Sequence, residues 1–288
     1  MAKDNNTNTS SNAENGKTDL EQLIKEIREL QEIELGILVD VDRLCKEHNI
    51  RYFLGEGTLL GAIRHNGFIP WDDDVDIIMP REDYNRFLEI APELLKPKYE
   101  VQHSTTVENY WSPFIKIRLL DENQKYRQAH IAHLTNHNGA LIDIFPLEYV
   151  PDPGSRKLER QHFAIHFFRM MLFIKLGLKP IDSYKKRLIK FAGHFYSVKR
   201  IHKRLDKEFN RYNDKKRQYI GSLATYHKLN KLVVPASVYE ESIDHEFEGH
   251  VFPVPKEFDL LLRTVYGDYM ELPPEEQRYI KHFFTADH

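Results

Sequence analysis

The feature that most constrains the fold of this chain is a run of acidic residues inside an apolar stretch. The acids are Asp72, Asp73, Asp74 and Asp76, and the apolar residues around them are Pro70, Trp71, Val75, Ile77 and Ile78. Neighbouring carboxylates repel one another, and each loses favourable hydration when it is buried. A fold that buries this segment must therefore supply a cation or hydrogen-bond donors at the same place.

The acids overlap a predicted strand over residues 74–79, which Pro80 would end. On a strand, Asp74 and Asp76 would share a face with Cα atoms roughly 6.5 to 7 Å apart, while Val75 and Ile77 would enter the core. Mg²⁺ or Mn²⁺ suits such a pair, because Mg²⁺ takes one or two carboxylates and keeps positions for phosphate and water. A solvated acidic turn is the alternative. An EF-hand calcium loop is excluded, because the sixth position is not glycine.

A turn of small residues lies upstream of the acids. Residues 51–55 predict a short buried strand and residues 58–64 a helix, so Gly57 and Thr58 fall between the two. Glycine lets a ligand approach the backbone, and a threonine at a helix start favours a phosphate group. A glycine turn alone is weak evidence, but one followed by a strand with Asp-x-Asp is far more specific.

A third acid stands in another apolar segment. Asp143 lies within residues 140–147, which predict a strand, and Ile142 and Ile144 flank it. A buried carboxylate needs a partner, and a metal shared with Asp74 and Asp76 would supply one. A salt bridge to Lys116 or Arg118 is the alternative.

The hydrophobic pattern divides the rest of the chain. Residues 1–18 are polar and predict a disordered tail, after which a helical pattern runs to about His48. Residues 19–150 alternate helices and strands and predict the core. Residues 151–235 predict a basic helical subdomain, and residues 236–288 a segment that packs back on the core. The expected fold class is α+β, a mixed sheet core with an inserted or appended helical subdomain.

The full pattern resembles a known family. The strings LGEGTLLGAIRHNGFIPWDDDVDIIMPREDY, LIDIFPL and FEGHVFPVPKEFDLLLRTVYGDYMELPPEEQR are similar to the LicD family of bacterial phosphocholine transferases, which are related to fukutin and fukutin-related protein. The similarity covers about residues 50–282, although the middle third matches loosely and Glu56 stands where a second glycine is frequent. It implies a nucleotidyltransferase-like catalytic core over residues 19–150.

The resemblance also implies a reaction. Family members transfer phosphocholine from CDP-choline, or a similar group from a related CDP-alcohol, to a sugar hydroxyl of teichoic acid or lipopolysaccharide and release CMP. The implied catalytic residues are Asp74, Asp76 and Asp143, which would bind the metal together with Asp72. The implied substrate-binding residues are Gly57, Thr58, Arg64, Arg81, Lys116 and Trp71. The two arginines could equally pair with local acids, and Trp71 could simply fill the core.

Composition limits the other classes of function. A formal net charge of -3 gives no reason to expect nucleic-acid binding, and the single cysteine, Cys45, fits a reducing compartment. The sequence shows neither a signal-peptide core nor the roughly 20 apolar residues that span a membrane. We therefore expect a cytoplasmic enzyme that acts on a lipid-linked glycan acceptor, with peripheral contact at the inner face of an anionic membrane.

The membrane expectation comes from an uneven distribution of charge. Between Lys175 and Arg217 stand fifteen Lys or Arg and four Asp or Glu, following the apolar residues 162–180. Anionic lipid would contact three cations and four apolar side chains: Lys185, Lys186, Arg187, Phe167, Phe168, Met171 and Phe173. A core helix followed by solvated helices is the alternative.

Three other functions are alternatives to this interpretation. A zinc site at His130, His133 and His137 is disfavoured because no cysteine stands near their loose spacing. A metal-dependent glycosyltransferase also uses Asp-x-Asp, and the released nucleotide, CMP against UDP or GDP, separates the two reactions. A non-catalytic protein on a retained fold is disfavoured because all three acids are present.

Overall fold

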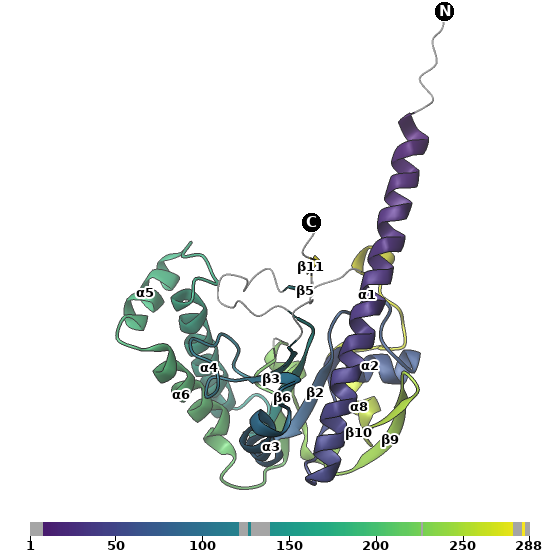
Figure 1. Cartoon of the computed structure of the whole chain (residues 1–288). Helices are drawn as coiled ribbons and strands as arrows, with labels where there is room; N and C mark the ends of the chain where they lie inside the picture. Colours follow the sequence, from purple (N-terminus) through teal and green to yellow (C-terminus); the bar gives the residue numbers. More distant parts are fainter. Residues whose placement is uncertain (1–7, 121–125, 128–138, 226, 279–283, 286–288) are drawn as a thin grey trace, which may run out of the picture.

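A mixed sheet forms the centre of the structure (Figure 1). The computed structural model describes residues 8–120, 126–127, 139–225, 227–278 and 284–285. Five strands lie in the order β1-β2-β6-β4-β3, and their bounds in that order are Phe53–Leu54, Asp76–Pro80, Leu141–Val150, Ile115–Leu119 and Tyr99–Gln102. β2 and β6 are parallel, and the other neighbours in this order are antiparallel.

The long strand β6 joins two parts of the sheet. Its first part pairs with β2 and β4, and its last residues pair with β7 (Tyr219–Gly221), which pairs with β8 (Val233–Pro235). Both segments lie within the residues for which the sequence predicts a mostly helical subdomain. A strand of three residues is too short to show a period of two, and only its pairing reveals it.

Helices α1 (Asn8–Glu47), α2 (Glu56–His65) and α3 (Arg81–Leu94) pack against this sheet. α1 packs against β6 and buries Leu30, Ile37, Leu38, Val41 and Leu44, which recur at helical spacing. It begins at Asn8, so residues 8–18 are helical where a disordered tail was predicted. Extending an existing helix costs much less than nucleating a new one, which allows a helix to continue beyond its apolar part.

A helical subdomain lies beside the sheet and contains α4 (Arg156–Lys175), α5 (Tyr184–Gly193) and α6 (Val198–Phe209) (Figure 1). Each helix begins after a serine whose hydroxyl accepts a hydrogen bond from the backbone N–H three residues later: Ser155, Ser183 and Ser197. α4 packs on both other helices, and α5 lies at the outer edge of the molecule. No helix of the described residues is long and apolar enough to cross a membrane.

The C-terminal part returns to the core. β9 (Ser242–Phe247) and β10 (His250–Pro255) form a hairpin that α8 (Phe258–Tyr266) follows. At the hairpin tip, one carboxylate oxygen of Glu248 accepts from the N–H of Phe68 at 3.0 Å, and the other accepts from Arg28 of α1 at 2.6 Å. Arg64 of α2 donates to the carbonyl of Tyr269 at 2.8 Å. These contacts connect the C-terminal part with α1 and α2.

Short elements complete the description. They are β5 (Tyr126–Arg127), α7 (Leu229–Leu232), β11 (Phe284–Thr285) and the 3-10 helices η2 (Asn210–Tyr212), η3 (Ala236–Tyr239) and η4 (Glu275–Gln277). The observed mixed sheet with a helical subdomain confirms the predicted fold class.

Candidate active site

The two parallel strands bring two of the predicted acids side by side. Asp76 opens β2, and its register partner on β6 is Asp143. Across β6, the partner of Asp143 is Lys116 of β4, whose own partner on β3 is Gln102. Register partners point to the same face of a sheet, so these residues form one polar row across four strands.

The other acids lie in the loop that leads into β2. Asp72 and Asp73 are buried and Asp74 is partly buried. Gln31 of α1 holds the loop by donating its side-chain amide to the carbonyl of Asp72 at 2.8 Å. The prediction that Asp74 and Asp76 share a strand was wrong, because β2 begins only at Asp76. Its edge neighbour β1 is two residues long and pairs only with Ile77 and Ile78, so the ladder does not extend back to Asp74.

Gly57 and Thr58 hold the acids from the first turn of α2. The hydroxyl of Thr58 accepts a hydrogen bond from the backbone N–H of Asp76 at 2.8 Å, which fixes the start of β2. A Cβ atom at Gly57 would collide with the Oδ2 atom of Asp72, so only glycine lets this carboxylate approach the helix start. The predicted turn therefore lies directly against the acids.

The electrostatics of Asp76 favour a cation. Burial raises the pKa of Asp76 well above its usual value, and it is raised further by the carboxylates of Asp74, Asp143, Glu56 and Asp72. Within the described part of the chain, no three Asp, Glu, His or Cys side chains form a group that holds a metal by itself. Mg²⁺ needs only one or two carboxylates when phosphate oxygens complete its shell. The donor set thus fits a metal that binds together with a phosphate substrate.

α1 contributes an acid that the sequence analysis missed. Glu34 is fully buried, and neither of its carboxylate oxygens has a hydrogen-bond partner among the described residues. Burial raises its pKa well above the usual value, and it is raised further by Asp74, Asp73, Asp143 and Asp76. A signal was present, since Glu34 stands four residues after Leu30 and four before Leu38, on the apolar side of the helix.

Asp143 is paired with a buried cation. The Nζ atom of Lys116 lies 2.5 and 2.7 Å from the two carboxylate oxygens, and the Lys116 side chain is only 2% exposed. The salt bridge considered in the sequence analysis is therefore present, and it contacts both oxygens of the predicted third metal ligand, each of which can still accept a second hydrogen bond. Lys116 also lies 5.2 Å from the centre of the Trp111 ring. The ammonium group of Lys116 therefore neutralises a carboxylate inside the site and does not face solvent.

The two predicted arginines make structural contacts. Arg81 donates to the buried Glu148, and its guanidinium lies 4.9 Å from the centre of the Tyr84 ring. Arg64 holds the C-terminal part through Tyr269, and burial lowers its pKa while Asp72 opposes that change. Of the two, Arg64 is therefore the one electrostatically coupled to the acids.

Two further positions clarify the edge of the site. Trp71 is partly buried, and the guanidinium of Arg278 lies 5.4 Å from the centre of its ring. Glu56 has a φ of 46°, in the left-handed region that favours glycine. Its carboxylate lies 2.6 Å from the Nε2 atom of His227.

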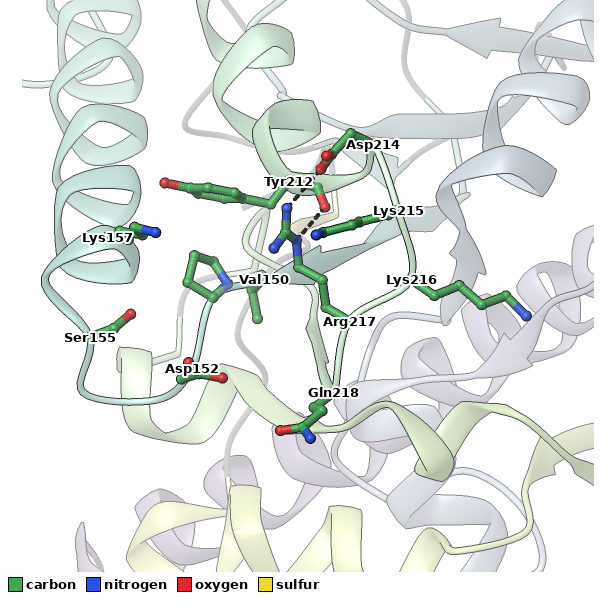
Figure 2. Close-up of a pocket in the computed structure, with 11 residues that line it drawn as sticks. Val150, Asp152, Ser155, Lys157, Tyr212, Asp214, Lys215, Lys216, Arg217 and Gln218 are labelled. Carbon is green, nitrogen blue, oxygen red and sulfur yellow. Dashed lines mark hydrogen bonds and ion pairs between the residues drawn. The ribbon is translucent and has the colours of Figure 1, made fainter.

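An open hollow of about 530 Å³ lies elsewhere (Figure 2). It is lined by residues where β6 ends and where β7 is about to begin, including Val150, Lys157 and Arg217. Val150 is seven residues along β6 from Asp143, roughly 23 Å at a strand's rise. Arg217 donates hydrogen bonds to the carboxylate of Asp214 at 2.7 Å and to the carbonyl of Tyr212 at 2.9 Å. None of the predicted site residues lines this hollow, so it does not replace the acid row as the candidate site.

Comparison with known proteins agrees with this geometry. The protein family described as "LicD/FKTN/FKRP, nucleotidyltransferase domain" matches residues 49–173, which contain every acid of the row and of the loop before β2. Lipopolysaccharide cholinephosphotransferase LicD of Haemophilus influenzae is 33% identical over 268 residues, which cover 90% of this chain and 97% of the relative. The chain belongs to the LicD family. A protein of Rickettsia typhi is 41% identical over 68 residues, 24% of this chain and 22% of its own length.

Membership of the LicD family confirms the predicted resemblance and identifies the chain as a transferase. It also confirms the nucleotidyltransferase domain that the glycine turn and the Asp-x-Asp pattern had indicated. The LicD relative aligns far beyond residue 173, so the similarity includes the helical subdomain and the C-terminal part. His130, His133 and His137 lie outside the described residues.

Proposed function

We propose that this protein transfers phosphocholine from CDP-choline to a sugar hydroxyl of a lipopolysaccharide-type glycan and releases CMP. The observation that carries the proposal is the register of Asp76 beside Asp143 on parallel strands inside the matched nucleotidyltransferase domain. The Haemophilus relative, a lipopolysaccharide cholinephosphotransferase, supports the choice of phosphocholine and lipopolysaccharide.

In this reaction the acceptor hydroxyl attacks the phosphorus that carries choline. A new oxygen–phosphorus bond forms, the bond to the oxygen of CMP breaks, and the hydroxyl proton passes to a base, for which we assign the Asp143 carboxylate. Such transfers depend mainly on positioning and on neutralising charge. A bound Mg²⁺ or Mn²⁺ would neutralise negative charge on the diphosphate and on departing CMP. We assign this metal to Asp74 and Asp76, with Asp72 as an outer partner.

The remaining residues position these groups. Thr58 fixes the backbone of Asp76, and Gly57 gives the Asp72 carboxylate room beside α2. Lys116 holds Asp143 in one orientation from the neighbouring strand. We assign Asp143 to the acceptor side, where its carboxylate would accept a hydrogen bond from the attacking hydroxyl.

Product analysis tests the proposal. The protein is incubated with Mg²⁺, a panel of CDP-alcohols and lipopolysaccharide that lacks phosphocholine, and released nucleotide is measured by chromatography. We expect CMP release that depends on the acceptor and is fastest with CDP-choline. The Asp76→Asn variant should lose this activity, whereas Asp244→Asn, a matched change at an exposed acid of β9, should retain it. Release of UDP or GDP from nucleotide sugars instead would establish a glycosyltransferase and refute the proposal.

A further inference from the structure

One side of α5 exposes a ridge of large apolar side chains. The exposed fractions of Tyr184, Leu188, Phe191 and Phe195 are 74%, 52%, 69% and 64%. Tyr184, Leu188 and Phe191 follow one another at intervals of four and three residues, so they lie along one side of the helix, and Phe195 stands in the turn directly after α5. The rings of Phe191 and Phe195 are in edge contact, with 5.6 Å between their centres. We call these four residues the α5 ridge.

The opposite side of α5 is already used by the fold. Ile189 and Ala192 pack against the core, and the buried Gly193 faces Met171 of α4. Lys175 of α4 donates to the carbonyl of Gly193 at 3.2 Å. α5 therefore has two apolar sides, one that attaches it to the molecule and the ridge, which is directed outward. A helix that only covered a core would need a single apolar stripe.

The ridge is bordered by positive charge. Lys185, Arg187 and Lys190 are exposed on the same helix. By helical geometry Lys185 lies on one side of the ridge, and Arg187 and Lys190 on the other. The surrounding segment from Lys175 to Arg217 carries fifteen Lys or Arg against four Asp or Glu, in a chain whose net charge is -3. The complementary surface is thus apolar in the middle and anionic on both sides.

We propose that α5 lies in the interfacial layer of an anionic lipid membrane, with the ridge among the lipid headgroups and the flanking cations on lipid phosphates. A helix with aromatic and leucine side chains bordered by Lys and Arg has the composition of an interfacial membrane helix. Its place at the outer edge of the molecule lets a flat surface reach it (Figure 1). A second copy of the chain fits less well, because a two-fold contact through the ridge would bring equal cations together.

This assignment corrects the residues expected to insert. Met171 and Phe173 are buried in the subdomain, and Phe167 and Phe168 pack against the core, so none of the four is a free apolar surface. Among the predicted cations, Lys186 is bound to Asp182 at 2.8 Å, whereas Lys185 and Arg187 are exposed. The sequence shows no continuous apolar run at the ridge, because basic residues stand between its members.

Vesicle co-sedimentation tests the proposal without donor or acceptor, so it can fail independently of the proposed reaction. The probes are vesicles of phosphatidylcholine alone and vesicles with phosphatidylglycerol as about a third of the lipid. We expect binding only to the anionic vesicles, weakening as salt increases. The double variant Lys185→Glu with Arg187→Glu should lower the affinity for anionic vesicles at least about thirtyfold, because each lost cation contributes about 1 kcal/mol of binding free energy. Leu188→Ser with Phe191→Ser should lower it about tenfold or more.

The matched control is Val251→Ser with Met270→Ser, which removes apolar side chains that are 53% and 55% exposed and lie outside the helical subdomain. This variant should bind as the wild type does. A Phe191→Trp variant should show a blue-shifted emission with anionic vesicles, which places the ridge itself in lipid. Equal binding to neutral vesicles, equal effects of ridge and control variants, or a dimer in analytical ultracentrifugation that the ridge variant abolishes would overturn the proposal.

Discussion

Changing Glu34 to glutamine isolates the electrostatic consequence of a buried acid on α1. The side chain has no exposed surface and no hydrogen-bond partner among the described residues, and the site acids raise its pKa together with burial. Glutamine has nearly the same size and shape but does not ionise. The variant should therefore keep the packing of α1 and remove only the acid–base equilibrium.

The sign of the pH dependence follows from the raised pKa. In the unfolded chain Glu34 ionises near its usual value of 4.5, whereas in the folded protein it holds its proton to higher pH. Between these two values each unit of increasing pH favours the unfolded chain by at most about 1.4 kcal/mol. The contribution of Glu34 to stability is thus complete below pH 4.5 and is lost as pH increases. The free energy of unfolding of Glu34→Gln should therefore exceed that of the wild type by an amount that grows with pH, by at most about 1.4 kcal/mol per pH unit.

Urea unfolding at several pH values from about 4 to 8, with a chelator present, measures this difference. The matched control is Glu32→Gln on the same helix, whose side chain is 66% exposed and forms a surface ion pair with Arg28. Its curve should stay within about 0.5 kcal/mol of the wild type at every pH. Parallel curves for wild type and Glu34→Gln would show that Glu34 is hydrated or partnered, and the reasoning would be wrong.

Three other predictions concern neighbouring charges. Asp76→Asn should raise the melting temperature in chelator, with a gain that grows as pH increases, because burial and nearby carboxylates raise the pKa of Asp76; an unchanged melting temperature across pH would contradict this. Asp143→Asn should instead cost about 3 kcal/mol in urea unfolding, because it leaves the buried ammonium of Lys116 without its counter-ion; wild-type stability would indicate that the pair opens in solution. Glu248→Gln should cost about 0.5 kcal/mol of stability at pH 7 and nothing well below pH 4.5, because the hydrogen bond from the half-exposed Arg28 lowers the pKa of Glu248. A loss of stability that persists in acid would point to the hairpin backbone instead.

The elements around the site were the most predictable part of the fold. The strands β1 and β6 and the helix α2 appear close to their predicted bounds, and β2 begins two residues later than predicted. Each carries a local signal, such as Pro80 at the end of β2 or the apolar run around Asp143. The sequence predicts that Asp143 meets Asp76, because a buried carboxylate needs a partner and a shared metal would supply one.

What the sequence did not reveal depends on contacts between distant segments. The pairing of Lys116 with Asp143 follows from the register of β4 against β6, which no local pattern encodes. The role of Glu34 depends on where α1 crosses the sheet, and the hairpin of β9 and β10 depends on Glu248 reaching Phe68. The placement of Asp74 before β2 reflects the two-residue length of β1, which also is set by the assembled sheet.

Binding of CDP-choline measured by calorimetry tests the central claim most directly, namely that the acids around Asp76 hold a divalent cation together with the donor diphosphate. We predict that the wild type binds CDP-choline with Mg²⁺ present, that chelation removes this binding, and that Asp76→Asn removes it while Asp244→Asn does not. Equal donor affinity with and without Mg²⁺, or in wild type and Asp76→Asn, would contradict the account.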